Sequence, residues 1–156
     1  YEQYPNLPEN IVFTGDIKHS RTIHSLVYLL NSKKKNICFY FVSEDELQPD
    51  NDLLKNLNYK IVSDINSIIK FADVLYVTRL QKERFKKNNL SVKNIIINDK
   101  LISKSKENLI IMHPLPRNEE LSCDLDENSK SKYFEQVENG VYVRMAILFN
   151  LIKNIK

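Results

Sequence analysis

Short apolar runs alternate with helically spaced apolar residues along this chain, and the first cycle is the clearest. The run NIVFTG, residues 10–15, ends at a glycine. Downstream, apolar residues recur at the three- and four-residue spacing of one helix face: Ile23, Leu26, Val27 and Leu30. Ser20 stands where this helix needs an N-cap, because a serine oxygen accepts a hydrogen bond from an unpaired first-turn N–H. The pattern predicts a strand, a tight turn and a helix.

The same rhythm continues through the middle of the chain. Apolar runs predict strands over residues 36–42, 59–63, 73–78 and 108–112. Helical spacing predicts helices over 49–57, 64–71 and 82–87, with Asp64 as the N-cap of the second, and a further apolar patch covers 94–99. Strands that are apolar throughout and alternate with helices are typical of a parallel sheet buried on both faces. We therefore expect an α/β fold: a doubly wound parallel sheet, Rossmann-like with three layers, in a single domain ending in a long C-terminal helix.

The predicted C-terminal helix differs from the others because its apolar face is unusually broad. One face carries Val141, Met145, Leu148, Ile152 and Ile155. Ala146 and Phe149 widen that face beyond what one sheet usually covers. Two interpretations stay open: the helix is buried on its own sheet, which the pattern slightly favours, or it packs against something outside this chain.

The composition fits one ordinary globular domain. Of the 156 residues, 42% are hydrophobic and 28% are charged, which supplies enough apolar side chain for a buried core. No stretch approaches the roughly 20 apolar residues of a membrane span, and the first ten residues lack the basic and apolar regions of a signal peptide. The net charge is only +3, and the basic residues are mostly lysine. We therefore expect no membrane partner. We also expect no nucleic-acid partner, because no arginine-rich stripe is present.

The counts of glycine, cysteine and histidine exclude several kinds of site. With only Gly15 and Gly140, the chain lacks the glycines of a Walker loop or a dinucleotide fingerprint. Cys38 and Cys123 do not have the paired spacing of a zinc motif. We therefore expect no metal site, and a reducing, cytoplasmic environment.

Ligands of open parallel sheets bind at the carboxyl ends of the strands, so the residues that follow each strand are the candidates. Arg21 and Thr22 fall in the first turn of the first helix, where free N–H groups and the positive end of the helix dipole attract an anion. A guanidinium there can hold a carboxylate or phosphate at two points. The alternative is a surface pair between Arg21 and Asp16.

A second candidate follows the predicted strand 73–78. Arg79 and Gln81 are two positions apart, so on an extended chain their side chains point the same way and offer a charge and an amide donor to a second carboxylate. Glu83 and Arg84 follow closely and would hold Arg79 in position. The alternative is an ordinary charge pair at the start of a helix.

The third candidate is the segment His113-Pro114-Leu115-Pro116. Its two prolines remove two N–H donors while every carbonyl remains, so the loop suits a ligand that carries N–H groups, such as an amine or a carbamoyl amide. The Leu115-Pro116 peptide bond is a candidate for the cis form. For His113, a structural role with hydrogen bonds to the backbone is favoured over that of a general base.

Four segments taken together form a specific pattern: GDIKHSRTIHSL (15–26), ADVLYVTRLQKERF (72–85), HPLPRNEEL (113–121) and YFEQVENGVYVRMAIL (133–148). In this order they resemble the aspartate-binding half of the aspartate carbamoyltransferase family, over nearly the whole chain. The TR-x-QKERF and HPLPR parts are the most specific. The related ornithine enzymes carry a cysteine at the second position of the HPLP-like motif and a Ser-Met-Gly loop, whereas this chain has Pro114 and no such loop.

The resemblance implies a role for each candidate residue. Arg21 would bind the α-carboxylate of L-aspartate, with Thr22 beside it. Arg79 and Gln81 would bind the β-carboxylate. The region of Leu115 and Pro116 would contact carbamoyl phosphate and the attacking amine. The reaction of this family needs no cofactor and no metal, because positioning and charge stabilisation carry the catalysis.

The resemblance also implies what this chain lacks. Residues 1–156 would form the aspartate-binding domain, and the N-terminal carbamoyl phosphate domain of the family, with its Ser-Thr-Arg-Thr phosphate loop, is not in this sequence. The domain alone is then expected to be inactive, and the full-length enzyme to be a homotrimer of pyrimidine biosynthesis with sites between subunits. The alternative is a non-catalytic module that binds an amino acid or joins oligomers.

Overall fold

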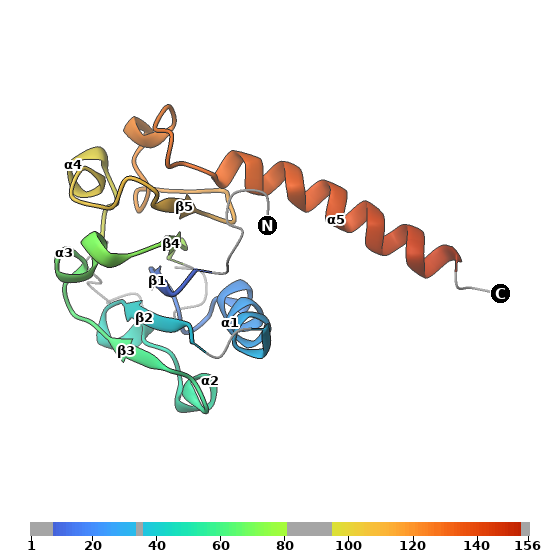
Figure 1. Ribbon diagram of the computed structural model, residues 1–156, viewed down its shortest axis with the longest axis horizontal. Coiled ribbons are helices and arrows are strands. Elements are labelled where there is room, and N and C mark those ends of the chain that lie inside the picture. The colour runs from blue at the N-terminus through green and yellow to red at the C-terminus, as the bar shows by residue number, and fades with distance from the viewer. Residues whose placement is uncertain (1–7, 34–35, 81–94, 154–156) are drawn as a thin grey trace.

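A computed structural model describes residues 8–33, 36–80 and 95–153, and its centre is one parallel sheet (Figure 1). Five strands lie in the order β3-β2-β1-β4-β5, and every neighbouring pair is parallel. The strands are β1 (Asn10–Thr14), β2 (Cys38–Val42), β3 (Tyr59–Ile61), β4 (Val74–Val77) and β5 (Ile110–Met112). The sheet reverses its strand order on either side of β1, so the predicted doubly wound α/β class is confirmed.

One face of the sheet is covered by α1 (Arg21–Lys33) and α2 (Asn51–Leu54). Phe13 of β1 stacks on Phe39 and Phe41 of β2, with ring centroids 6.3 and 5.8 Å apart. Ile23 and Val27 of α1 pack in the same core cluster, and both side chains are fully buried. The helical spacing read from the sequence therefore marks the buried face of α1.

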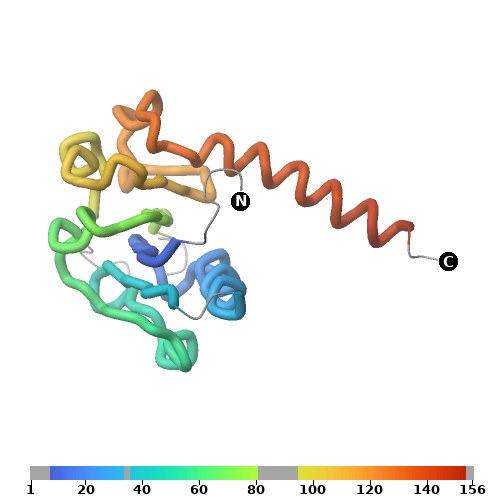
Figure 2. Tube along the Cα trace, in the orientation of Figure 1, coloured from blue at the N-terminus to red at the C-terminus, as the bar shows by residue number. Residues whose placement is uncertain are grey.

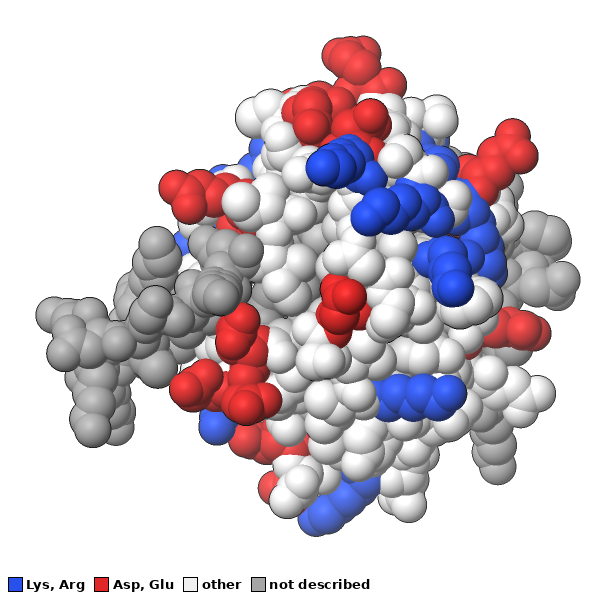
Figure 3. Space-filling view, turned by 90° about the vertical axis from the view of Figure 1, so that its left-hand side faces the viewer, with Lys and Arg blue, Asp and Glu red and all other residues white. Residues whose placement is uncertain are grey.

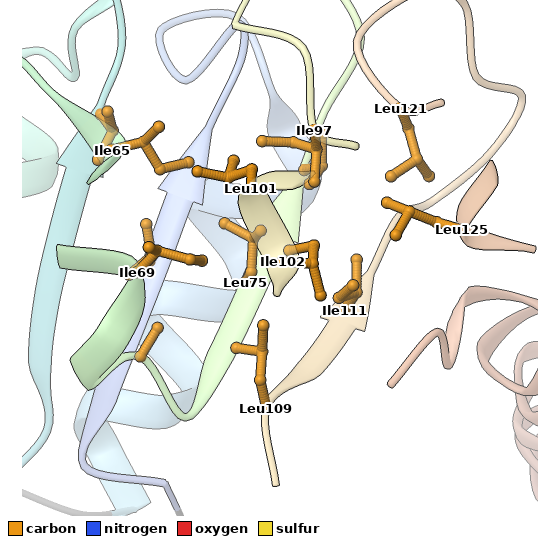
Figure 4. Close-up of a cluster of buried hydrophobic side chains, with 14 of the residues drawn as sticks. Ile65, Ile69, Leu75, Ile97, Leu101, Ile102, Leu109, Ile111, Leu121 and Leu125 are labelled. Atoms are coloured by element: carbon orange, nitrogen blue, oxygen red, sulfur yellow. The ribbon is translucent and has the colours of Figure 1, made fainter. Parts of the chain in front are cut away.

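The opposite face is covered by α3 (Ile65–Ile68), the 3-10 turn η2 (Ile69–Phe71) and α4 (Asp99–Ile102). Figure 4 shows the aliphatic side chains of these helices meeting Leu75 of β4 and Ile111 of β5. Two further 3-10 turns, η1 (Asp45–Leu47) and η4 (Cys123–Leu125), lie in the loops. The three layers of the predicted fold are thus present.

Several local expectations are met through specific hydrogen bonds. The Ile23 N–H donates to Ser20 Oγ over 3.4 Å at the start of α1, and the Asn66 N–H donates to Asp64 Oδ1 over 2.9 Å at the start of α3. Both predicted N-caps are confirmed. The predicted helix over 82–87 lies outside the described residues.

The apolar patch at 94–99, which the sequence did not assign to a helix or strand, does not join the sheet. Its Ile97 forms an isolated bridge with Leu121 and is fully buried. The edge strand β3 is exposed at all three residues, since β2 is its one neighbour in the described sheet. The helix predicted over 49–57 shortens to α2.

The long C-terminal helix α5 (Tyr133–Lys153) leaves the sheet at its first turn and extends away from the domain (Figures 1 and 2). Only Tyr133 is buried, and apolar side chains such as Val141, Met145 and Leu148 are roughly half exposed (46%, 60% and 58%). The interpretation that slightly favoured burial on its own sheet was wrong. Instead of α5, Leu121 and Leu125 of the segment between β5 and α5 pack into the core with Ile111 of β5.

The surface carries charges of both signs. On the face that bears α3 and α4, basic side chains lie next to acidic ones without forming a continuous basic field (Figure 3). Within residues 8–33, 36–80 and 95–153, no helix is long and apolar enough to span a membrane. The same ranges contain no group of three or more His, Cys, Asp or Glu side chains placed to hold a metal ion.

Candidate functional site

The carboxyl ends of β1, β4 and β5 meet around one cavity of about 230 Å³. Its walls are residues 19–22 before and in α1, Thr78 and Arg79 after β4, and residues 113–116 after β5. All three segments singled out from the sequence therefore converge at one edge of the sheet. Arg21, Thr22, Arg79, His113, Leu115 and Pro116 all line this cavity. Gln81, Glu83 and Arg84 lie outside the described residues.

Gly15 makes the turn after β1 possible. Its φ of +99° lies in a region that side chains disfavour, and a β-carbon there would come within 1.9 Å of the Thr78 carbonyl oxygen. Thr78 is also bonded to the end of β1, because its N–H and its hydroxyl both donate to the Thr14 carbonyl, over 2.9 and 3.2 Å. Glycine thus lets the ends of β1 and β4 lie close enough to share one site.

Arg21 projects from the N-terminal turn of α1 and is exposed at the cavity wall. The buried carboxylate of Asp16 accepts hydrogen bonds from the His19 N–H over 3.1 Å and lies 2.8 Å from His19 Nδ1. The alternative pair between Arg21 and Asp16 is therefore wrong. Arg21 forms no ion pair with any acid in the described part of the chain, which leaves its guanidinium available to an anionic ligand.

Arg79 follows the buried Thr78 and is half-buried in the cavity wall. Its position next to β4 places it across the cavity from the start of α1. Two guanidinium groups thus border a cavity of small-molecule size from two different strand ends. This arrangement suits a ligand with two separate anionic groups.

The segment after β5 is held by His113 from below. His113 is fully buried, and its Nδ1 accepts the Leu115 N–H over 2.9 Å. The Leu115–Pro116 bond is cis, as the sequence suggested, and Leu115 has a φ of +45°. The favoured structural role of His113 agrees with these contacts, since both ring nitrogens are engaged within the protein.

Sequence reasoning missed Glu120, which binds the other side of the His113 ring. Glu120 is 4% exposed, and its Oε1 lies 3.1 Å from His113 Nε2 and accepts the Asn118 N–H over 2.9 Å. Burial raises the pKa of the Glu120 carboxyl, but hydrogen bonds from His113, from the Asn118 N–H and from its own backbone together outweigh burial and hold the pKa below its usual value. The only sequence signal for Glu120 is an acidic pair at 119–120, and such a pair is typical of an ordinary exposed loop.

Arg117, the third arginine that follows a strand, does not line the cavity. Its guanidinium pairs with both oxygens of Asp126, which also accepts the Tyr133 hydroxyl over 2.6 Å. Hydrogen bonds from Arg117 and then from Tyr133 lower the pKa of Asp126 to about 2, and the Asp126 bond raises the pKa of Arg117. This cluster fastens the loop after β5 to the base of α5.

Gln136, also missed, reaches the site from the second turn of α5. Its Oε1 accepts the His113 N–H over 3.0 Å, so the long helix contacts the segment that follows β5. A lone glutamine in an otherwise exposed helix gives no sequence signal for such a contact.

Comparison with known proteins agrees with this geometry. Residues 9–151 match the family described as aspartate/ornithine carbamoyltransferase, Asp/Orn binding domain. The chain belongs to this family. The aspartate carbamoyltransferase catalytic subunit of Methanobrevibacter smithii is 45% identical over 151 residues, which are 92% of this chain and 47% of the relative. The corresponding subunit of Vibrio campbellii is 40% identical over 146 residues, covering 89% and 47%.

Solved structures give the same result. The catalytic subunit of M. jannaschii aspartate transcarbamoylase is 41% identical with a TM-score of 0.82, covering 94% of this chain and 50% of that one. The Trypanosoma cruzi aspartate transcarbamoylase in complex with carbamoyl phosphate and aspartate is 36% identical with a TM-score of 0.80, covering 90% and 49%. This chain therefore spans about half the length of the relatives it matches.

Proposed function

We propose that this chain is the aspartate-binding half of an aspartate carbamoyltransferase. The full enzyme would transfer the carbamoyl group of carbamoyl phosphate to the amine of L-aspartate, giving N-carbamoyl-L-aspartate and phosphate for pyrimidine synthesis. The observation that carries this proposal is the cavity bordered by Arg21 and Arg79 and closed by the donor-poor loop at 113–116. A relative with this fold is described in complex with both substrates.

Aspartate fits the two arginines because its carboxylates are separate and its amine lies between them. In the proposed mode Arg21, aided by Thr22 and the N-terminus of α1, binds the α-carboxylate. Arg79 and Gln81 bind the β-carboxylate, and Glu83 and Arg84 support Arg79. Charge-assisted guanidinium bonds at two points would fix the orientation of the substrate, so that its amine faces the loop after β5.

The loop after β5 would contact carbamoyl phosphate and the attacking amine. Leu115 and Pro116 line the cavity in a segment held by the buried His113. As the amine nitrogen bonds to the carbamoyl carbon, the bond from that carbon to the phosphate oxygen breaks, and phosphate leaves with the electron pair and takes up the proton that the amine nitrogen loses. His113 would act as a positioning residue for this step and not as a base, because Leu115 and Glu120 occupy its two nitrogens.

The other half of the site would come from an N-terminal carbamoyl phosphate domain. The exposed apolar length of α5 supports this, since a helix of that kind needs a covering surface. We further propose that the enzyme is a homotrimer in the cytoplasm, working without cofactor or metal. Cys38 and Cys123 are both free thiols, which suits a reducing compartment.

The experiment is an assay of the full-length protein that contains this domain, with carbamoyl phosphate and L-aspartate, following carbamoylaspartate by mass. We expect saturable product formation, and no comparable product when L-ornithine replaces aspartate. Tight binding of aspartate without product would favour the alternative, a non-catalytic binding module. If the full-length protein neither bound aspartate nor formed product, the proposal would be overturned.

A further inference from the structure

Gln136 is one of the few side chains of α5 that faces the sheet domain. Among the described residues of this helix, Tyr133 is buried and Gln136 and Gly140 are half-buried, whereas all the others are exposed. Tyr133 is held in the cluster with Arg117 and Asp126, away from the cavity. Gln136 is therefore the polar side chain through which the base of α5 contacts the candidate site.

The contact is made with the first residue after β5. The ladder of β5 ends at Met112, so the next backbone N–H, that of His113, needs an acceptor from outside the sheet. Gln136 Oε1 supplies it over 3.0 Å, across 23 positions of sequence. Below that N–H the His113 ring is fixed by Leu115 and Glu120. Removing the amide would leave a partly buried donor unpaired, which is costly.

The Tyr76 ring of β4 is buried, and burial raises the pKa of its hydroxyl. The neighbouring side chains of Thr22 and Gln136 offset part of that rise.

We propose that Gln136 is a positioning residue of the site, which holds the segment 113–116 in place through the His113 N–H. This inference rests on the proposed function. Gln136 does not line the cavity, so it acts through this segment and not on the substrates. Its removal should therefore affect the use of both substrates at once.

The test uses the full-length protein with Gln136→Met, which keeps the length of the side chain and removes the amide. We expect kcat/KM to fall about tenfold for aspartate and for carbamoyl phosphate, as for a lost hydrogen bond to a partly buried donor. The control is Asn51→Met on α2, where the residue is exposed and does not line the cavity. It should stay within twofold of wild type.

Gln136→Glu separates positioning from simple loss of stability, because it keeps a side-chain oxygen that can accept the His113 N–H. It should bring kcat/KM back to within threefold of wild type, whereas Gln136→Met should not. A Gln136→Met variant that lowers the melting temperature while leaving kcat/KM unchanged, or a Gln136→Glu variant as impaired as Gln136→Met, would overturn the inference. An inactive wild-type protein would instead overturn the proposed function, and this inference with it.

Discussion

Gly15 lies so close to Thr78 that a β-carbon on Gly15 would stand 1.9 Å from the Thr78 carbonyl oxygen. We therefore predict that Gly15→Ala destabilises the protein by about 3 kcal/mol or more, because the new methyl group adds a backbone clash to an unfavourable φ. Chemical denaturation of the purified variant measures this effect. It should also weaken aspartate binding, since the ends of β1 and β4 would have to separate.

Gly140 provides the matched control for that substitution. It lies inside α5, and a β-carbon there meets only the Arg144 side chain at 3.5 Å or more. Gly140→Ala should stabilise the helix by about 1 kcal/mol, the usual difference between the two residues in a helix interior. If both glycine variants behaved alike, the close approach of Gly15 to Thr78 would not be a requirement of the fold.

Acid sensitivity should arise in part from Asp126. Its pKa is about 2 in the folded protein because Arg117 and Tyr133 bind the carboxylate, and it is 3.8 without those partners. The folded-state pKa is the lower one, so the stabilisation is fully present above about pH 4 and is lost as the pH falls toward 2. Denaturation of wild type and Asp126→Asn at several pH values should show a difference that shrinks over this window. A pH-independent difference would contradict the assignment.

The uncovered length of α5 predicts how the chain behaves alone. The 156-residue chain should bind an apolar dye or self-associate through α5, and Val141→Gln with Leu148→Gln should reduce both effects without changing the melting of the sheet domain. Leu29→Gln, which alters a similarly exposed leucine on α1, is the control and should change neither. A monodisperse monomer with an ordered α5 and no dye binding would count against the proposal that another domain covers the apolar side chains of α5.

The parts of the structure that the sequence predicts well are those set by local spacing. Ser20 and Asp64 cap helices as expected, because an N-cap acts within three residues of itself. The apolar spacing of α1 marks its buried face. The convergence of Arg21 and Arg79 follows from the rule that parallel strands end at one edge.

The features that escape the sequence depend on contacts between distant residues. The apolar patch around Ile97 could not be assigned to an element from its spacing, and the structure buries Ile97 through an isolated bridge with the distant Leu121. The buried Glu120 carboxylate accepts a hydrogen bond from Nε2 of His113, seven positions away. The pattern of α5 indicates an apolar helix, but whether a sheet or another domain covers it is not a local property of that pattern.

The central claim is that Arg79 and Arg21 each bind one carboxylate of aspartate, and Arg79→Lys in the full-length protein tests it most directly. Lysine keeps the charge but loses the planar two-point geometry. With each substrate varied in turn at fixed salt, we predict that kcat/KM for aspartate falls by about 30- to 1000-fold. The half-saturating concentration of carbamoyl phosphate should change little. If turnover and aspartate saturation stayed within threefold of wild type, Arg79 would not bind substrate and the account of this site would be contradicted.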